Sequence, residues 1–158
     1  MNETPIIAAS SIARIRSRWL GGLRCRSRVE RDADDGRQTS IVLETDAARF
    51  ADIRGSDTSA SSVEHLLHAL TSSVMATMVQ RAQLEGIAIE LVTSSSIGVR
   101  PKPMSADSQP QPLQAIDLKF EVKASERASE IEQLCANDPM YKTLRRALPV
   151  TISVIQAA

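Results

Sequence analysis

Residues 61–86 read SSVEHLLHALTSSVMATMVQRAQLEG and specify one long helix with a marked start and a marked end. Ser61 and Glu64 form a capping-box sequence, in which the serine hydroxyl accepts the Glu64 amide hydrogen while the glutamate carboxylate reaches back. Gly86 supplies the C-terminal stop. Apolar side chains recur between them at helical spacing, at Val63, Leu66, Leu67, Leu70, Val74, Met78 and Ala82. We expect a helix over residues 61–85 that is buried along at least one face.

The segment before this helix has the period of a half-buried strand. Arginines occupy every second position on either side of Gly21-Gly22, at Arg14, Arg16, Arg18, Arg24, Arg26 and Arg28. Residues 11–29 therefore predict a hairpin. A three-residue loop at residues 20–22 gathers all the arginines on one face, whereas a two-residue loop at the glycines mixes arginines with apolar residues. We predict the three-residue loop, whose pairs are Trp19 with Leu23, Ser17 with Cys25 and Ile15 with Ser27.

The rest of the N-terminal third continues this pattern as a meander. The polar run RDADDG at residues 31–36 predicts a second turn. Residues 39–44 are rich in β-branched side chains and predict a third strand. Residues 46–60 contain Gly55, Asp57 and several serines, and we expect a loop that leads into the long helix.

The chain after the helix alternates strands with shorter helices. Residues 87–93 and 115–122 predict strands, separated by a loop with four prolines, Pro101, Pro103, Pro110 and Pro112. A broken helix is expected over residues 125–136 and 139–146, and a last strand over residues 150–154. These elements predict an α+β fold. At 158 residues, the chain has the size of one domain, and we expect a single domain over residues 1–158.

Composition excludes several classes of protein. The 19 basic and 19 acidic residues balance, which argues against a dedicated nucleic-acid or membrane-surface protein. No stretch approaches the roughly 20 apolar residues that span a bilayer, and the first residues lack the basic and apolar regions of a secretory signal. We expect a soluble, cytoplasmic protein. Its two cysteines, Cys25 and Cys135, lack the spacing of a zinc or CxxC motif and are expected to be reduced.

Three motifs make the sequence resemble the OsmC/Ohr family, and together they extend over nearly all of the chain in the family's order. They are RWLGGL at residues 18–23, VEHLLHAL with a following small-residue triplet at residues 63–73, and DPMYKTLRRALPVTISV at residues 138–154. The resemblance implies an intertwined homodimer in which N-terminal strands of both subunits share a sheet and the central helices pack inside. It also implies a relation to enzymes that reduce organic hydroperoxides with two cysteines and no cofactor.

The resemblance places the family's two cysteines at positions where this chain has none. The peroxidatic cysteine falls on Ser73 and the resolving cysteine on Asp138. Peroxide reduction needs a thiolate that forms a sulfenic acid and a second thiol that captures it. A serine hydroxyl cannot replace the first. We therefore expect an OsmC-like protein without the two-cysteine cycle, with a small hydrophobic or anionic ligand in a pocket at the dimer interface near Glu64, Ser72 and Ser73.

Two alternatives stay open. Cys135 lies one helical turn before Asp138 and could act as a single displaced thiol, with Arg24 matching the arginine that steadies the thiolate in family enzymes. The family's glutamate position falls on Val63, so that Glu64 is one residue away from it. The second alternative is polyanion binding through the arginine face of the hairpin, although Trp19, the aromatic residue of this stretch, lies on the opposite parity.

A metal site is not predicted. Glu64, His65 and His68 lie close together, but the histidines are spaced i, i+3, and the chain has no third histidine. Ser73 also lacks the G-x-S-x-G sequence of a hydrolase nucleophile.

Overall fold

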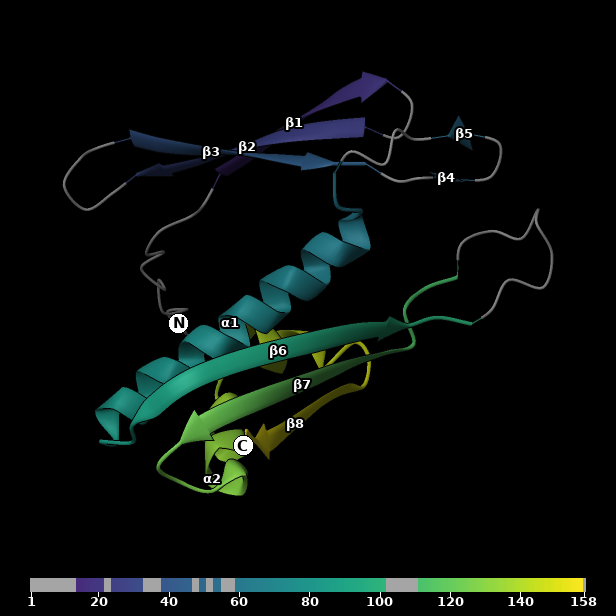
Figure 1. Cartoon of the computed structure of the whole chain (residues 1–158). Helices are drawn as coiled ribbons and strands as arrows, with labels where there is room; N and C mark the ends of the chain where they lie inside the picture. Colours follow the sequence, from purple (N-terminus) through teal and green to yellow (C-terminus); the bar gives the residue numbers. More distant parts are fainter. Residues whose placement is uncertain are drawn as a thin grey trace, which may run out of the picture. The chain divides into compact units, whose positions relative to one another are not determined.

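The computed structural model describes residues 14–21, 24–32, 38–46, 49–50, 53–54, 59–101 and 111–157. The chain divides into two compact units, residues 1–62 and residues 63–158. Their elements confirm the predicted α+β composition (Figure 1). The sequence predicts that residues 1–158 form a single domain. Since each unit is described by itself, this stays a prediction.

The first unit contains the predicted meander. Strands β1 (Arg14–Gly21), β2 (Arg24–Asp32) and β3 (Gln38–Thr45) form an antiparallel sheet in the order β1-β2-β3. Residues 22–23 and 33–37, which connect these strands, lie outside the described residues. The alternation of arginines with apolar residues therefore identified both strands of the hairpin.

The predicted hairpin register is wrong by two residues. Trp19 pairs with Cys25, Ser17 with Ser27 and Ile15 with Val29. The ladder shifts between Trp19 and Gly21 and closes with Gly21 opposite Arg24, because the bulge takes up Leu20. A shift of two residues preserves the faces of a strand. The arginines therefore still share one face, with Arg18 opposite Arg26 and Arg16 opposite Arg28.

Two short strands occupy the region expected to be a loop. Strands β4 (Arg49–Phe50) and β5 (Ile53–Arg54) pair antiparallel. A strand of two residues is too short to produce a periodic pattern, so the sequence contained no signal for either.

The central helix begins and ends where its capping residues predict. Helix α1 (Ser62–Leu84) leaves Ser61 at the N-cap position. At the other end Gly86 has φ +73°, and the Ile87 amide donates to the Ala82 carbonyl oxygen at 2.8 Å. This is the Schellman arrangement, in which a glycine in the left-handed region closes the helix.

The second unit is built on a mixed sheet. Strands β6 (Ile89–Val99), β7 (Ala115–Ala124) and β8 (Val150–Gln156) lie in that order, with β6 antiparallel and β8 parallel to β7. Strand β6 runs to Val99, beyond the predicted end at residue 93, because its Thr93–Ser96 run has no apolar alternation. Pro101 and Pro112 lie outside the strands as predicted, whereas residues 102–110, with Pro103 and Pro110, are not among the described residues.

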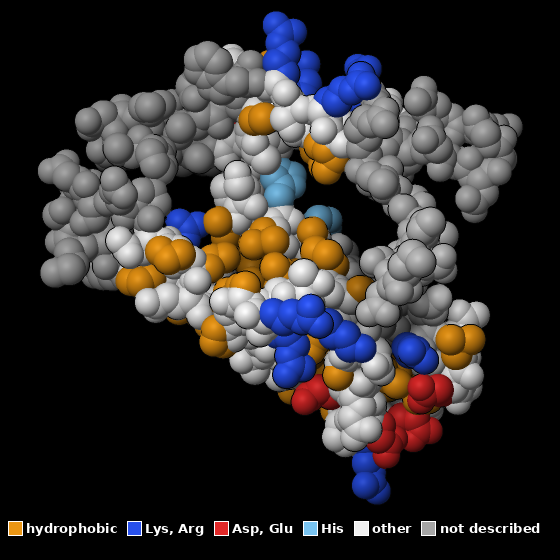
Figure 2. Space-filling model, turned by 180° about the vertical axis from the view of Figure 1, so that it is seen from behind, with side chains coloured by type: hydrophobic (Ala, Val, Ile, Leu, Met, Phe, Trp, Pro, Cys, Tyr) orange, Lys and Arg blue, Asp and Glu red, His pale blue; other side chains and the backbone are white. Residues whose placement is uncertain are grey.

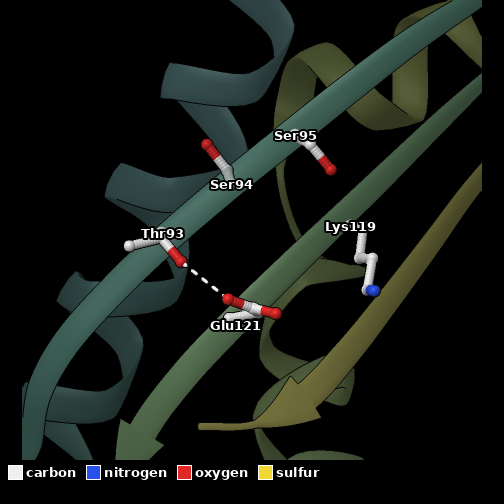
Figure 3. A pocket seen from close by; sticks show the side chains of 5 residues that line it. All are labelled: Thr93, Ser94, Ser95, Lys119 and Glu121. Carbon is white, nitrogen blue, oxygen red and sulfur yellow. Dashed lines mark hydrogen bonds between the residues drawn. The ribbon is translucent and has the colours of Figure 1, made fainter.

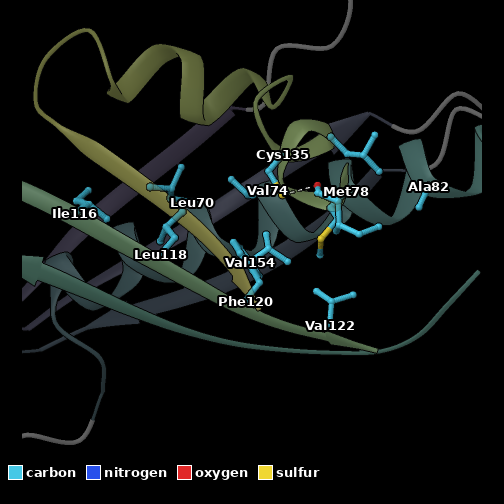
Figure 4. Packing of buried hydrophobic residues seen from close by; sticks show 12 residues of the cluster. Leu70, Val74, Met78, Ala82, Ile116, Leu118, Phe120, Val122, Cys135 and Val154 are labelled. Atoms are coloured by element: carbon cyan, nitrogen blue, oxygen red, sulfur yellow. Dashed lines mark hydrogen bonds between the residues drawn. The ribbon is translucent and has the colours of Figure 1, made fainter. Parts of the chain in front are cut away.

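The broken helix connects β7 to β8, as a parallel pair requires. It consists of α2 (Ala128–Cys135) and α3 (Pro139–Leu144). Side chains of α1, α2 and one face of the sheet form the core (Figure 4). Its fully buried members include Leu70, Val74, Met78, Ile116, Leu118, Phe120, Val122 and Ile131. This packing holds α1 against the segment that carries Asp138.

Candidate functional site

The two positions that the resemblance assigned to the family's cysteines are in contact. The Ser73 hydroxyl donates a hydrogen bond to Asp138 Oδ2, with 2.7 Å between the oxygens. Thr77 lies one turn further along α1, and its hydroxyl donates to the same Oδ2 at 2.9 Å. Two hydroxyl groups from α1 therefore converge on one carboxyl oxygen from the start of α3.

The second carboxyl oxygen of Asp138 caps a helix. The Tyr141 amide donates to Asp138 Oδ1 at 2.7 Å, and Asp138 is the N-cap residue of α3 with extended backbone. Pro139 follows at the first helical position, where proline loses no helical hydrogen bond. Asp-Pro at this point thus begins α3 and directs the carboxyl group toward α1.

Burial makes these hydrogen bonds important for the fold. Asp138 is 0% exposed, and Ser73 is half-buried. A buried carboxyl group without partners carries a large desolvation cost, whereas this one accepts from three donors across its two oxygens. The Ser73–Thr77–Asp138 cluster therefore joins α1 to α3 inside the unit.

The other predicted pocket residues do not join this cluster within one chain. Ser72 is exposed, and its hydroxyl donates to the His68 carbonyl oxygen of its own helix at 2.7 Å. Glu64 is also exposed, and it lies nine residues before Ser73. Nine residues of α-helix correspond to a rise of about 13.5 Å, so Glu64 and Ser73 are far apart along α1.

Cys135 is buried in the core at 0% exposure. Its thiol donates to the Ile131 carbonyl oxygen at 3.6 Å. Burial, together with the nearby carboxylate of Glu132, raises the pKa of the Cys135 thiol to about 12. A thiol with this pKa is protonated at neutral pH, and a protonated thiol is a poor nucleophile.

The remaining candidates lie elsewhere. Cys25 is half-buried in β2, and both cysteines are free thiols. The Arg24 side chain lies outside the described residues. Within the described ranges, no group of three or more His, Cys, Asp or Glu residues is arranged to hold a metal ion. No helix in the described part of the chain is long and apolar enough to cross a membrane.

A shallow hollow on β6 and β7 has no comparable organisation. It is lined by Thr93, Ser94, Ser95, Lys119 and Glu121 (Figure 3). The Thr93 hydroxyl donates to Glu121 Oε2 over a long 3.4 Å. Lys119 and Glu121 contribute opposite charges, so the hollow favours neither anions nor cations.

Sequence reasoning missed Thr77, although two signals pointed to it. Thr77 follows Ser73 by four residues, which places both hydroxyl groups on the same face of a helix. Asp138 before Pro139 is a typical helix start, so an acceptor for these hydroxyls was present in the sequence. Only the packing of α3 on α1 brings the three residues together.

Comparison of the whole structure finds solved structures with the same fold. An OsmC like protein from Mycoplasma pneumoniae matches with a TM-score of 0.63 and 17% identity, over 93% of this chain and 98% of that one. An organic hydroperoxide resistance protein OsmC from Legionella pneumophila matches with a TM-score of 0.61 and 16% identity, over 93% and 97%. The organic hydroperoxide resistance protein OhrB of Bacillus subtilis matches with a TM-score of 0.54 and 14% identity, over 91% and 98%.

These likenesses confirm the OsmC/Ohr resemblance at the level of the fold. No protein-family model and no curated protein matches the sequence. The chain has an OsmC-like fold, and its chemistry has to be argued from its own residues.

Proposed function

We propose that this chain is an OsmC-like protein related to the thiol-dependent hydroperoxide reductases but without their two-cysteine cycle. The observation that carries the proposal is the 2.7 Å hydrogen bond between Ser73 and Asp138. The positions expected to hold the two thiols hold a hydroxyl and a carboxyl group bonded to each other. The oxygens replace the reactive pair with a structural one.

The chemistry of the cycle supports this proposal. A peroxidatic thiolate attacks one oxygen of the hydroperoxide, the O–O bond breaks, and an alcohol leaves as the sulfur becomes a sulfenic acid. A second thiol then displaces water and forms a disulfide. Ser73 has no oxidised state that a dithiol can reduce, and Asp138 has no sulfur with which to capture an intermediate. Neither half of the cycle is available at this site.

The alternative that uses Cys135 as a displaced thiol is less well supported. With a pKa of about 12, the thiolate fraction of Cys135 at pH 7 is on the order of 10⁻⁵. The side chain is fully buried, so a hydroperoxide has no direct approach to the sulfur. Both facts point to a structural cysteine that packs as a small hydrophobic residue.

We also propose a homodimer with a small hydrophobic or anionic ligand bound in an interface pocket near Ser72 and Ser73. The β1–β3 sheet supports an obligate partner, because one of its faces exposes Ile15, Ile41 and Leu43 at 59%, 42% and 40%. On α1, Val79 is 42% exposed. Large apolar side chains gathered on one exposed face are commonly covered by another surface. The free thiols fit the reducing cytoplasm, which we propose as the compartment.

Hydroperoxide consumption tests the main proposal. The wild-type protein is incubated with cumene hydroperoxide and dithiothreitol, and the remaining hydroperoxide is measured against a protein-free sample. We expect equal rates in both. Robust turnover by the wild type that disappears in Cys135→Ser and persists in Cys25→Ser would overturn the proposal and support the displaced-thiol enzyme.

A further inference from the structure

The arginine face of the first unit contains a hollow with four guanidinium groups around it. Its lining residues are Arg16, Arg18, Leu20, Arg26, Arg28 and Val42. All four arginines are exposed and lie on the same face of β1 and β2. In Figure 2, basic side chains project outward from this sheet at the top of the view.

The register places these charges close together. Arg16 lies directly opposite Arg28, and Arg18 directly opposite Arg26. Residues opposite each other in an antiparallel pair have Cβ atoms about 4.5–5.5 Å apart, and like charges in such pairs are destabilising. Alternate residues along a strand are about 6.8 Å apart. The Cβ atoms of the four arginines thus form the corners of a small rectangle, and their positively charged guanidinium groups repel one another.

The described acidic residues balance this charge only in part. Arg26 forms an ion pair with Glu44, with 2.6 Å between Nη2 and Oε1. Neither Arg18 nor Arg28 forms an ion pair with any residue that the structure describes. Arg18 and Arg28 therefore leave a local excess of positive charge on this face, in a chain whose overall charge is zero.

Two apolar side chains line the hollow together with the arginines. Leu20, at the end of β1, is 36% exposed, and Val42, directly opposite Arg28 on β3, is 53% exposed. Every basic residue between positions 14 and 28 is arginine and none is lysine. The planar guanidinium group binds phosphate through paired, parallel hydrogen bonds, which the compact ammonium group of lysine does not form.

We propose that this hollow is a binding site for an organic phosphate with a short apolar body. The dianionic phosphate head lies between guanidinium groups of both strands, and the apolar body contacts Val42, which lies directly opposite Arg28. A carboxylate has two oxygens and one charge, so it satisfies fewer of the four guanidinium groups. The site belongs to the first unit, whereas Ser73 and Asp138 belong to the second, and the site does not depend on the function proposed for that pair.

Nucleic acid fits this face less well. In the sequence, Trp19 does not share the alternating positions of the arginines, and this pattern does not favour base stacking on the arginine face. The net charge of zero also provides no long-range attraction for a polyanion. A hollow lined by both guanidinium groups and apolar side chains favours a small amphipathic anion.

Titration calorimetry with hexyl phosphate at low salt tests the proposal, with inorganic phosphate and hexanoate as comparison ligands. We expect saturable binding that is tightest for hexyl phosphate, because only this ligand supplies both the dianion and the apolar body. The double variant Arg18→Gln/Arg28→Gln should weaken binding by roughly tenfold or more, since it removes two charged donors. Arg100→Gln/Arg146→Gln, with the same charge change at exposed positions of the second unit, should leave binding unchanged.

Two further variants and a melting measurement distinguish a loss of binding from a loss of folding. Arg18→Lys/Arg28→Lys retains the charge and loses the paired donors, so we expect intermediate affinity. Val42→Asp places a negative charge in the hollow and should abolish binding. The glutamine variant should melt no lower than the wild type, because it relieves repulsion between arginines. Absence of saturable binding, equal affinity in the wild type and the glutamine variant, or binding only to RNA or to phosphatidylserine vesicles would overturn the proposal.

Discussion

Ser73 donates a hydrogen bond to Asp138, a residue 65 positions later in the sequence, with 2.7 Å between Oγ and Oδ2. This contact joins the middle of α1 to the N-cap residue of α3. It is made of oxygen atoms at the two positions where a resemblance to hydroperoxide reductases expects sulfur. Three predictions concern this contact, and two concern the nearby thiol of Cys135.

Removal of the Asp138 carboxyl group should destabilise the second unit strongly. Asp138→Ala leaves the Ser73 and Thr77 hydroxyls without their acceptor and removes the α3 cap. We expect a loss of about 3 kcal/mol in the free energy of unfolding, from a lost cap and unsatisfied donors. Asp138→Asn, which keeps the shape and one acceptor oxygen, should cost clearly less. Urea denaturation measures both, and equal losses would show that the hydrogen bonds contribute little.

Ser73 and Thr77 should behave as coupled residues, because they share one acceptor oxygen. Ser73→Ala and Thr77→Val should each cost about 1 kcal/mol of stability, as expected for one hydrogen bond to a buried group. The cost of the double variant should differ from the sum of the two single costs. Each hydroxyl donates to Asp138 Oδ2, so removing one changes the strength of the hydrogen bond that the other makes to the same oxygen. A double-mutant cycle by urea denaturation gives this coupling directly, and strict additivity would contradict it.

Cysteines introduced at both positions should be able to form a disulfide. In a background of Cys25→Ser/Cys135→Ser, the variant Ser73→Cys/Asp138→Cys replaces two oxygen groups already in contact. We expect mild oxidation to remove both free thiols within one chain, as measured by thiol titration and non-reducing electrophoresis. Each single-cysteine variant is the control and should keep its thiol. Failure of the pair to close would mean that the backbones of α1 and α3 lie too far apart for a disulfide.

The Cys135 thiol should be unreactive in the folded protein. Iodoacetamide at pH 8 should label Cys25 and leave Cys135 unlabelled until a denaturant is added, because Cys135 is fully buried and its pKa is raised to about 12. Peptide mapping by mass spectrometry separates the two sites. Rapid labelling of native Cys135 would restore the displaced-thiol enzyme as a candidate.

The same pKa predicts a pH dependence of stability. The thiol pKa in the folded state, about 12, lies above the ordinary value of 9.0, so the folded protein holds this proton more tightly than the unfolded chain. Its contribution is fully present below pH 9 and is lost as pH rises toward 12, by about 4 kcal/mol in total. Cys135→Ala removes this term. The stability difference between wild type and variant should therefore shrink across this pH range.

Local sequence signals predicted helix α1 well and the sheet less completely. A capping serine and a terminal glycine act within one turn of the helix ends, so both ends of α1 were readable. Strand β6 was predicted too short because its central residues are small and polar. The hairpin faces were predicted correctly, since parity survives a shift of two residues, but the bulge that sets the register leaves no periodic signal.

The sequence by itself determined the α+β order of elements, the arginine face of the hairpin and the identities of Ser73 and Asp138 at the expected cysteine positions. Tertiary structure alone decided that these two residues form a hydrogen bond, that Thr77 donates to the same carboxyl oxygen, and that Cys135 is buried in the core. The physical reason is distance along the chain. Periodicity and caps report interactions over a few residues, whereas a contact across 65 positions depends on how α3 packs against α1.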